Sequence, residues 1–444
     1  MRKNNDLVRG LPGPDTILRK QFPNGATVLI HENPRSGTAA VCGSLPAGYG
    51  LDELEKPGVS AFVSAALIAG TRSRTFAQIS DFLESRGAVL SFGTDPDAIR
   101  FKGNCLCEDL PDLLALLKEI LDEPAFPEHY LEVLRHRALS GFDVNEDDSE
   151  EGAYWAFKGI LWGEDHPYGR LKNGADEDIP NITRDDLVNF HKRFFGPKDL
   201  VLSLSGGFRA QEIMDRCGEI FGSWNKAQED VNAEELFPEG IEDDCSFRLH
   251  FDSPGRKEVS LVMGTFGPAG GDPDFLPVWL GNNIFGGDEF ADRISRVVRE
   301  KYGLAYLVCS ALDPRKRGGC WSVRAGIDPA NLEKAGDLIT GEIRRFTAEP
   351  VSPQELEDAK SRYITGLPLY FEDNQGTASM IHSLACYHRD PDYWLRIPER
   401  FSRITPGSLL ETVRKWIDPD KLVIVTIGPG DERNENRYWW PSVS

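Results

Sequence analysis

The eight histidines are the side chains best suited to bind a metal or transfer a proton, but their spacing places no two of them together on a helix. Two ligands on one helix face normally stand three or four residues apart, as in His-x-x-Glu-His. The closest pairs here, His129 with His136 and His382 with His388, are seven and six residues apart. We therefore expect no metal in this chain, although ligands from distant segments could still converge. His166 lies in a His-Pro-Tyr-Gly turn, where we predict a structural role.

Arg299 and Tyr306, seven residues apart in the second half, could support a different chemistry. A tyrosine hydroxyl is a neutral donor that tolerates a dry cleft, and a guanidinium presents fixed donors to carbonyl oxygens. Donors aimed at a developing oxyanion lower the barrier to peptide hydrolysis. Spacing alone leaves an alternative, in which Arg299 is a solvated helix residue beside Glu300 and Tyr306 fills a strand face. Arg296, about one turn earlier, competes for the same role.

The elements that must position these residues come in runs of strands and helices. In the first half we predict strands at 22–31, 38–45 and 98–106, and helices at 58–69, 76–86 and 109–121. In the second half we predict strands near 246–251 and 258–266, helices at 273–285 and 290–302, and a hairpin of 305–312 with 319–326. Such runs, without strict βαβ alternation, indicate an α+β fold with largely antiparallel sheets.

The chain also repeats itself at a constant spacing. Each copy contains a capped helix, a turn with proline and an apolar strand. The matching pairs, all 222 positions apart, are Thr183 with Thr405, Pro197 with Pro419, and Val201 with Val423. A repeat this long indicates two homologous domains. We place the first domain at 1–225, a polar linker at 226–244 and the second domain at 245–444.

Composition narrows the function classes. A formal charge of −21 argues against binding to nucleic acid or to an anionic membrane. The longest nearly apolar run, residues 59–69, is too short to cross a bilayer. The eight cysteines form no Cys-x-x-Cys pair, so we expect free and mostly buried thiols. The first ten residues have no apolar core of a signal peptide, so we expect a cytoplasmic protein, or a periplasmic one if a leader has been removed.

Residues 57–75 read Pro-Gly-Val-Ser-Ala-Phe-Val-Ser-Ala-Ala-Leu-Ile-Ala-Gly-Thr-Arg-Ser-Arg-Thr. This stretch resembles the zinc-binding helix of the pitrilysin/insulinase metallopeptidases, which include the mitochondrial processing peptidase. That family has Gly-x-x-His-x-x-Glu-His-x-x-x-x-Gly-Thr here. The frame persists as Gly58, Gly70 and Thr71. The apolar positions of the same stretch predict a helix face that builds the core: Val59, Phe62, Val63, Ala66 and Leu67.

The reactive positions of that family are replaced in this chain. The two histidine positions hold Ala61 and Ala65, and the glutamate position holds Ser64. The family's third ligand, a glutamate further along the chain, falls on Ser140 or Gly141. Since alanine, serine and glycine offer neither an imidazole nor a carboxylate, the resemblance implies a relative that has lost its metal and its base.

The segment 284–308 resembles the second domain of the same family, where an arginine and a tyrosine bind the substrate backbone and stabilise the oxyanion. These two residues correspond to Arg299 and Tyr306. Family members form clam-shell pairs, so the resemblance implies the metal-free subunit of a heterodimeric zinc peptidase, or of a larger assembly. The zinc and His-x-x-Glu-His would belong to a homologous partner, and the substrates would be unfolded peptides or small proteins. The alternative is an inert structural or peptide-binding scaffold subunit. The aromatic tail at 437–441 could pack on its own domain or anchor a partner.

Overall fold

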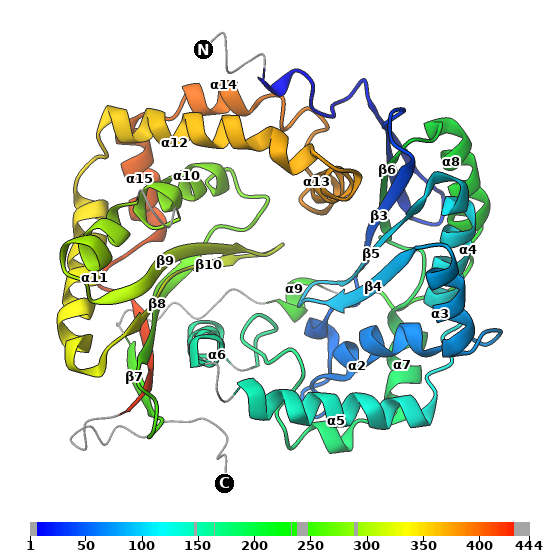
Figure 1. The fold of residues 1–444 in the computed structure, drawn as a ribbon, viewed down its shortest axis with the longest axis horizontal. Helices are drawn as coiled ribbons and strands as arrows, with labels where there is room; N and C mark the ends of the chain where they lie inside the picture. The colour runs from blue at the N-terminus through cyan, green and yellow to red at the C-terminus, as the bar shows by residue number, and fades with distance from the viewer. Residues whose placement is uncertain are drawn as a thin grey trace. The chain divides into compact units, whose positions relative to one another are not determined.

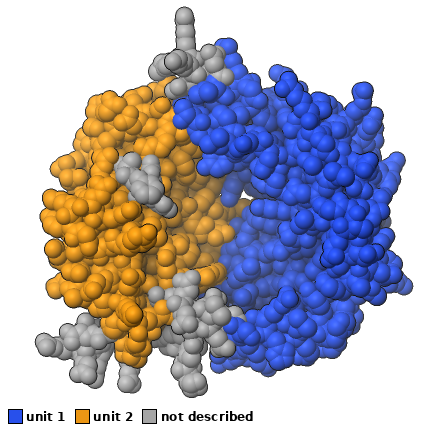
Figure 2. All heavy atoms as spheres, viewed as in Figure 1, with its two compact units in different colours: residues 1–140, 171–237, 364–398 blue, residues 141–170, 238–363, 399–444 orange. Residues whose placement is uncertain are grey.

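The computed structural model describes residues 7–145, 149–163, 165–231, 233–237, 247–287 and 292–429. The tail at 437–441 lies outside this range, as do parts of the predicted linker and the start of the predicted helix at 290–302. The chain forms two compact units, coloured separately in Figure 2. Unit 1 comprises residues 1–140, 171–237 and 364–398, and unit 2 comprises 141–170, 238–363 and 399–444. Each unit therefore contains a segment from the other half of the sequence.

Unit 1 contains a six-stranded sheet. In sheet order its strands are β1 (Ile17–Gln21), β2 (Thr27–Glu32), β6 (Val201–Gly206), β3 (Thr38–Leu45), β5 (Ile99–Leu106) and β4 (Val89–Thr94). All neighbours are antiparallel except β2 and β6. The predicted strand at 22–31 is wrong at its start, because Phe22 N–H donates to the Ala26 carbonyl across a turn. Gly25, at φ 93°, supplies the left-handed residue that this turn needs.

Helices cover both faces of this sheet (Figure 1). Those of unit 1 are α2 (Val59–Ala66), α3 (Phe76–Ser85), α4 (Leu110–Asp122), α7 (Arg184–Phe194), α8 (Ala210–Cys217), α9 (Ala233–Leu236) and α13 (Asn374–Cys386). α13 packs on β3 and β6, on the face opposite α3, α4 and α8. Its contact with β3 includes the small buried side chains of Ala40, Cys42 and Ala378, which let the helix approach the sheet closely.

Unit 2 contains a five-stranded sheet with a matching strand order. Its strands are β7 (Phe247–Asp252), β11 (Val423–Gly428), β8 (Val259–Gly267), β10 (Gly319–Ile327) and β9 (Ala305–Pro314). Only β7 and β11 are parallel, as β2 and β6 are in unit 1. The sequence repeat reappears in the structure. Thr183 caps α7 through the Asp186 N–H, Thr405 caps α15 through the Ser408 N–H, and β6 and β11 begin 222 residues apart.

The helices of unit 2 are α6 (Ser149–Trp162), α10 (Phe275–Phe285), the π-helical segment η6 (Ser295–Lys301), α11 (Leu332–Ala348) and α15 (Pro406–Trp416). Three further helices extend across the unit boundaries: α5 (Glu128–Asn145), α12 (Pro353–Gly366) and α14 (Ile397–Ser402). α6 packs on β8 and β11, just as α13 packs on the sheet of unit 1. The predicted fold class is confirmed: two homologous α+β domains, each with a largely antiparallel sheet. In the described part of the chain, no helix is long and apolar enough to span a membrane.

Candidate functional site

The start of α2 is fixed by a buried carboxylate. Asp52 Oδ2 accepts hydrogen bonds from Gly58 N–H at 2.9 Å and from the Ser60 hydroxyl at 3.1 Å, while Oδ1 accepts from Ser60 N–H at 2.9 Å. A negative charge at this position also complements the positive end of the helix dipole. Gly58 has φ 92°, and a Cβ there would lie 2.2 Å from the Asn173 carbonyl oxygen. Only glycine fits, so this part of the frame has a folding role.

Gly70 and Thr71, at the other end of this motif, also have a role in folding. Thr71 is buried, and its hydroxyl donates to Glu119 Oε1 on α4 at 2.5 Å while accepting from Arg74 N–H at 2.9 Å. Glu119 also accepts from the Ser73 hydroxyl and from Arg74 Nε, the latter at 3.1 Å. Burial alone would raise the pKa of Glu119, but these hydrogen bonds hold it below its usual range. Gly70, at φ 146°, precedes this turn in a conformation that other residues rarely adopt. The Gly…Gly-Thr frame therefore has structural reasons to persist whether or not a metal is bound.

The positions that correspond to zinc ligands and base lie on two helices. Ala61, Ser64 and Ala65 are on α2, where Ala61 and Ser64 are buried and Ala65 is exposed. Ser140 and Gly141 are on α5, and the Ser140 hydroxyl donates to the His136 carbonyl at 2.7 Å. No side chain at these positions is an imidazole or a carboxylate, so they do not fit Zn²⁺. Within the described ranges, no group of three or more His, Cys, Asp or Glu is arranged to hold a metal. The core face predicted for α2 is confirmed, since Val59, Phe62, Val63, Ala66 and Leu67 are all buried.

His166 takes the structural role predicted from its turn. Its Nδ1 accepts from Tyr168 N–H at 3.0 Å, and its ring stacks on Trp162 with centroids 4.7 Å apart.

The thiols also match expectation. The described cysteines are free, and five are buried: Cys42, Cys105, Cys217, Cys320 and Cys386.

Arg299 lies on η6, which is anchored at its start. Asp292, only 1 % exposed, accepts from Ser295 N–H at 2.7 Å, and burial raises its pKa to about 6. Arg293 forms a two-pronged ion pair with Glu355 on α12, at 2.9 and 3.0 Å, which lowers the pKa of Glu355 to about 2. This geometry is the strong form of an arginine–carboxylate contact. The wide π-helical turns of η6 are a conformation often found at functional sites.

A glycine turn brings Arg299 and Tyr306 together. Gly303, at φ 62°, ends η6 with its N–H bonded to the Arg299 carbonyl at 2.9 Å, and β9 begins two residues later. The Arg299 guanidinium carbon lies 5.9 Å from the centre of the Tyr306 ring, within cation–π range. Tyr306 is 89 % exposed, and its hydroxyl forms no hydrogen bond with any described residue. Arg296 is exposed one turn earlier, and the cation–π contact of Tyr306 within the described ranges is with Arg299.

Tyr306 lies on the edge strand of its sheet, because β9 pairs with β10 alone among the described strands. The middle of the outer side of β9 is already bonded: the Ser310 carbonyl accepts from Asn282 Nδ2 at 3.2 Å, and the Val308 carbonyl accepts from the Ser295 hydroxyl at 3.3 Å. Ser310 N–H donates to the Gly286 carbonyl at 2.7 Å, which ties β9 to the end of α10. A Cβ on Gly286 would lie 2.9 Å from that nitrogen, so close backbone approach explains this glycine.

The residues that support this site, Asp292 and Glu355, were not predicted from the sequence. The only available signal for Asp292 was an acidic residue shortly before a helical stretch.

Two family patterns match the chain. Residues 27–153 match "Insulinase (Peptidase family M16)", and residues 181–363 match "Peptidase M16 inactive domain". An uncharacterised zinc protease of Rickettsia bellii (strain RML369-C) is 23 % identical over 350 residues, which are 79 % of this chain and 82 % of that protein. The β-subunit of the mitochondrial processing peptidase of Neurospora crassa is 24 % identical over 392 residues, with 85 % and 81 % of the two chains covered.

Solved structures show the same fold. A peptidase M16 inactive domain from Pseudomonas fluorescens superposes with a TM-score of 0.85 at 23 % identity, covering 94 % of this chain and 99 % of that one. A protease from Helicobacter pylori superposes with a TM-score of 0.85 at 17 % identity, covering 94 % and 100 %.

Proposed function

The chain belongs to the insulinase family of peptidases, family M16, and from this premise we propose that it is the metal-free subunit of a heterodimeric zinc peptidase. In this proposal a homologous partner supplies the zinc site. This chain supplies Arg299, Tyr306 and part of the wall of the substrate chamber. Its match to the inactive type of M16 domain supports a non-catalytic member of the family.

One contrast carries the proposal. The positions for zinc and base hold alanine, serine and glycine, whereas Arg299 and Tyr306 are in contact and Tyr306 is almost fully exposed. Single exposed aromatic side chains are common on protein surfaces, so the support comes from the exposure of Tyr306 together with its contact with Arg299. A chain that served only as a scaffold would have no need for a phenol presented beside a guanidinium.

The chemistry assigned to the pair follows from its donors. A zinc ion in the partner would polarise the scissile carbonyl and activate water. The Tyr306 hydroxyl would donate to the oxyanion that develops on that carbonyl, and Arg299 would bind a neighbouring backbone carbonyl of the substrate. Removing one such donor from an enzyme typically lowers kcat by about 10²–10³-fold. An extended peptide could be held in part by strand addition to a sheet edge.

The second candidate function is an inert scaffold or peptide-binding subunit. It is favoured by the structural explanation for Gly58, Gly70 and Thr71, because these residues would persist through folding needs alone. The two candidates differ in one respect. Only the peptidase subunit requires the side chains of Arg299 and Tyr306.

Reconstitution tests the proposal. The chain would be purified alone and mixed with a His-x-x-Glu-His homologue from the same organism, and bound zinc and cleavage of an unfolded peptide would be measured. We expect neither zinc nor cleavage from the chain alone, and cleavage from the mixture that exceeds that of the homologue alone. Stoichiometric zinc in this chain, or a mixture no more active than the homologue, would overturn the proposal.

A further inference from the structure

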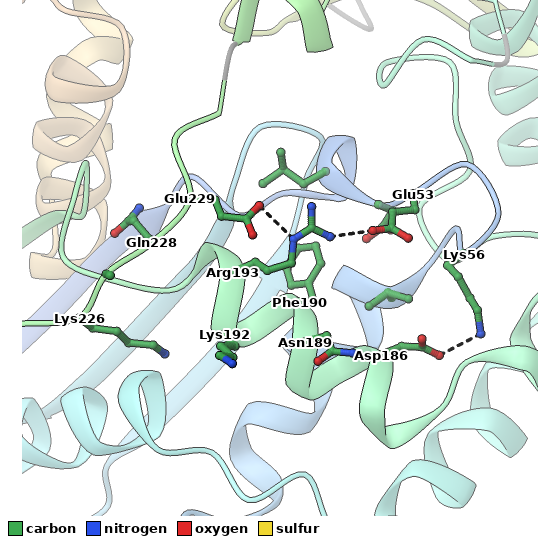
Figure 3. A pocket seen from close by; sticks show the side chains of 14 residues that line it. Glu53, Lys56, Asp186, Asn189, Phe190, Lys192, Arg193, Lys226, Gln228 and Glu229 are labelled. Atoms are coloured by element: carbon green, nitrogen blue, oxygen red, sulfur yellow. Dashed lines mark hydrogen bonds and ion pairs between the residues drawn. The ribbon is translucent and has the colours of Figure 1, made fainter.

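A polar pocket lies within unit 1, apart from the residues discussed so far for catalysis. It encloses about 700 Å³ between the loop before α2, helix α7 and the segment 226–229 (Figure 3). Its lining includes the apolar side chains of Leu51, Val59 and Phe190. This volume is typical of small-molecule sites.

The carboxylates of the pocket already have partners. Asp52 caps α2, as described above. Asp186 accepts from the Thr183 N–H at 2.8 Å and binds Lys56 at 3.0 Å. Glu53 and Glu229 approach the Arg193 guanidinium from opposite sides, at 2.7 and 3.0 Å, and thereby join two walls of the pocket (Figure 3).

Two lysines of the lining have no such partner. Among the described residues, neither Lys192 nor Lys226 forms an ion pair; Lys192 is exposed and Lys226 is half-buried. The charge of Asp122 acts on Lys226, but the oxygens of Asp122 bind Lys118 at 2.6 Å and the Trp224 indole at 2.8 Å. The pocket therefore contains two ammonium groups whose charge is not neutralised by contact with a carboxylate.

The Lys226 ammonium lies beside a neutral histidine. His191 Nε2 lies 2.9 Å from the Leu121 carbonyl oxygen, which can only accept, so Nε2 carries the proton. Lys226 Nζ lies 3.3 Å from both ring nitrogens of His191, so it lies between them and not in line with the lone pair of Nδ1. Burial, with Lys226 nearby, lowers the pKa of His191 to about 4, so the ring stays neutral at pH 7. Burial also lowers the pKa of Lys226 to about 8, although the charge of Asp122 partly opposes this shift.

We propose that this pocket binds a small oxyanion, a molecule with a phosphate or carboxylate group held by Lys192 and Lys226. Leu51, a half-buried apolar residue of the lining, offers a surface for the rest of the ligand. Because every residue of the pocket belongs to unit 1, the proposal does not depend on the peptidase role of Arg299 and Tyr306.

Calorimetric titration of the full chain at low salt tests the site. Inorganic pyrophosphate and tricarballylate serve as the phosphate and carboxylate probes. We expect saturable binding of at least one probe, weakened about tenfold or more by Lys226→Met and by Lys192→Met. Lys257→Met, which removes an exposed lysine of unit 2, is the matched control and should bind normally. The stronger probe identifies the anion class.

A footprint on the unmodified chain covers the case in which a variant fails to fold. Lysines would be acetylated at pH 8 with and without the stronger probe, and the products located by mass spectrometry. Protection of Lys226 and Lys192, with Lys257 unchanged, is the expected result. No saturable binding of either probe up to roughly 10 mM, or equal affinity in folded lysine variants and wild type, would overturn the proposal.

Discussion

Replacing Asp52 tests whether the motif residues around α2 persist because folding needs them. The carboxylate accepts three hydrogen bonds, two from backbone N–H groups at the helix start and one from a buried hydroxyl. Loss of a capping side chain costs about 0.5–2 kcal/mol, and each buried donor left unpaired costs about 1–3 kcal/mol unless water replaces the acceptor. Allowing for water at one donor, we expect Asp52→Ala to destabilise α2 by about 3 kcal/mol. Asp52→Asn, which keeps one oxygen, should cost about 2 kcal/mol.

Hydrogen exchange of the peptide that covers α2 is the appropriate assay, because it reports local opening separately from global unfolding. A 3 kcal/mol loss corresponds to an increase of about 150-fold in the exchange rate of the protected amides. Glu55→Ala, at an exposed acidic position in the same loop, is the control and should change exchange less than about threefold. If Asp52→Ala exchanged like the control, the folding explanation for the frame would be wrong.

Three further predictions concern stability. Gly58→Ala should lower the free energy of unfolding, measured in urea, by at least about 2 kcal/mol, because its Cβ meets a carbonyl oxygen at 2.2 Å. Gly87→Ala, at φ 57° in open space, should lower it by only about 1 kcal/mol. Equal losses in the two variants would refute the steric argument. The pKa of His191 is lowered to about 4 in the folded protein, so the unfolded state takes up the proton first as pH falls below 6.5. Between pH 7 and 5 the free energy of unfolding of the wild type should therefore fall by about 2 kcal/mol more than that of His191→Gln. Parallel pH profiles of the two proteins would contradict this. Glu355→Gln should lower the free energy of unfolding by about 1–2 kcal/mol at pH 7. Since the pKa of Glu355 is lowered to about 2, this difference between wild type and variant should fade as pH drops from about 4.5 towards 2. A difference that does not change with pH would exclude the Arg293 ion pair as its cause.

Local patterns predicted much of the fold. The helix face of α2, the hairpin of β9 with β10 and the 222-residue repeat all follow from short-range periodicity and capping residues, and the structure contains each of them. The turn before β2 was missed, because Phe22 and Ala26 pair across a tight turn within a run that resembles one strand. The sequence did not predict that α6, from the first half of the chain, packs on the sheet of unit 2, or that α13, from the second half, packs on the sheet of unit 1. This packing depends on which sheet offers a complementary face, such as the small residues Ala40 and Cys42.

The candidate site was predictable in part. The positions of Arg299 and Tyr306 came from family resemblance, and the structure places their side chains in contact. Their supports were not predictable, because Arg293 and Glu355 are 62 residues apart and nothing local in either segment indicates the other. The roles of Arg299 and Tyr306 in catalysis stay predictions.

The catalytic efficiency of the reconstituted pair tests the central claim most directly. We would measure kcat/KM for peptide cleavage with Tyr306→Phe and with Arg299→Ala in this chain, and with Tyr302→Phe as the control at another exposed tyrosine of unit 2. The account predicts a fall of about 100-fold or more for Tyr306→Phe, a clear loss for Arg299→Ala and no change for the control. Wild-type efficiency with both residues replaced, while the subunits still associate, would contradict the catalytic role and leave the scaffold interpretation.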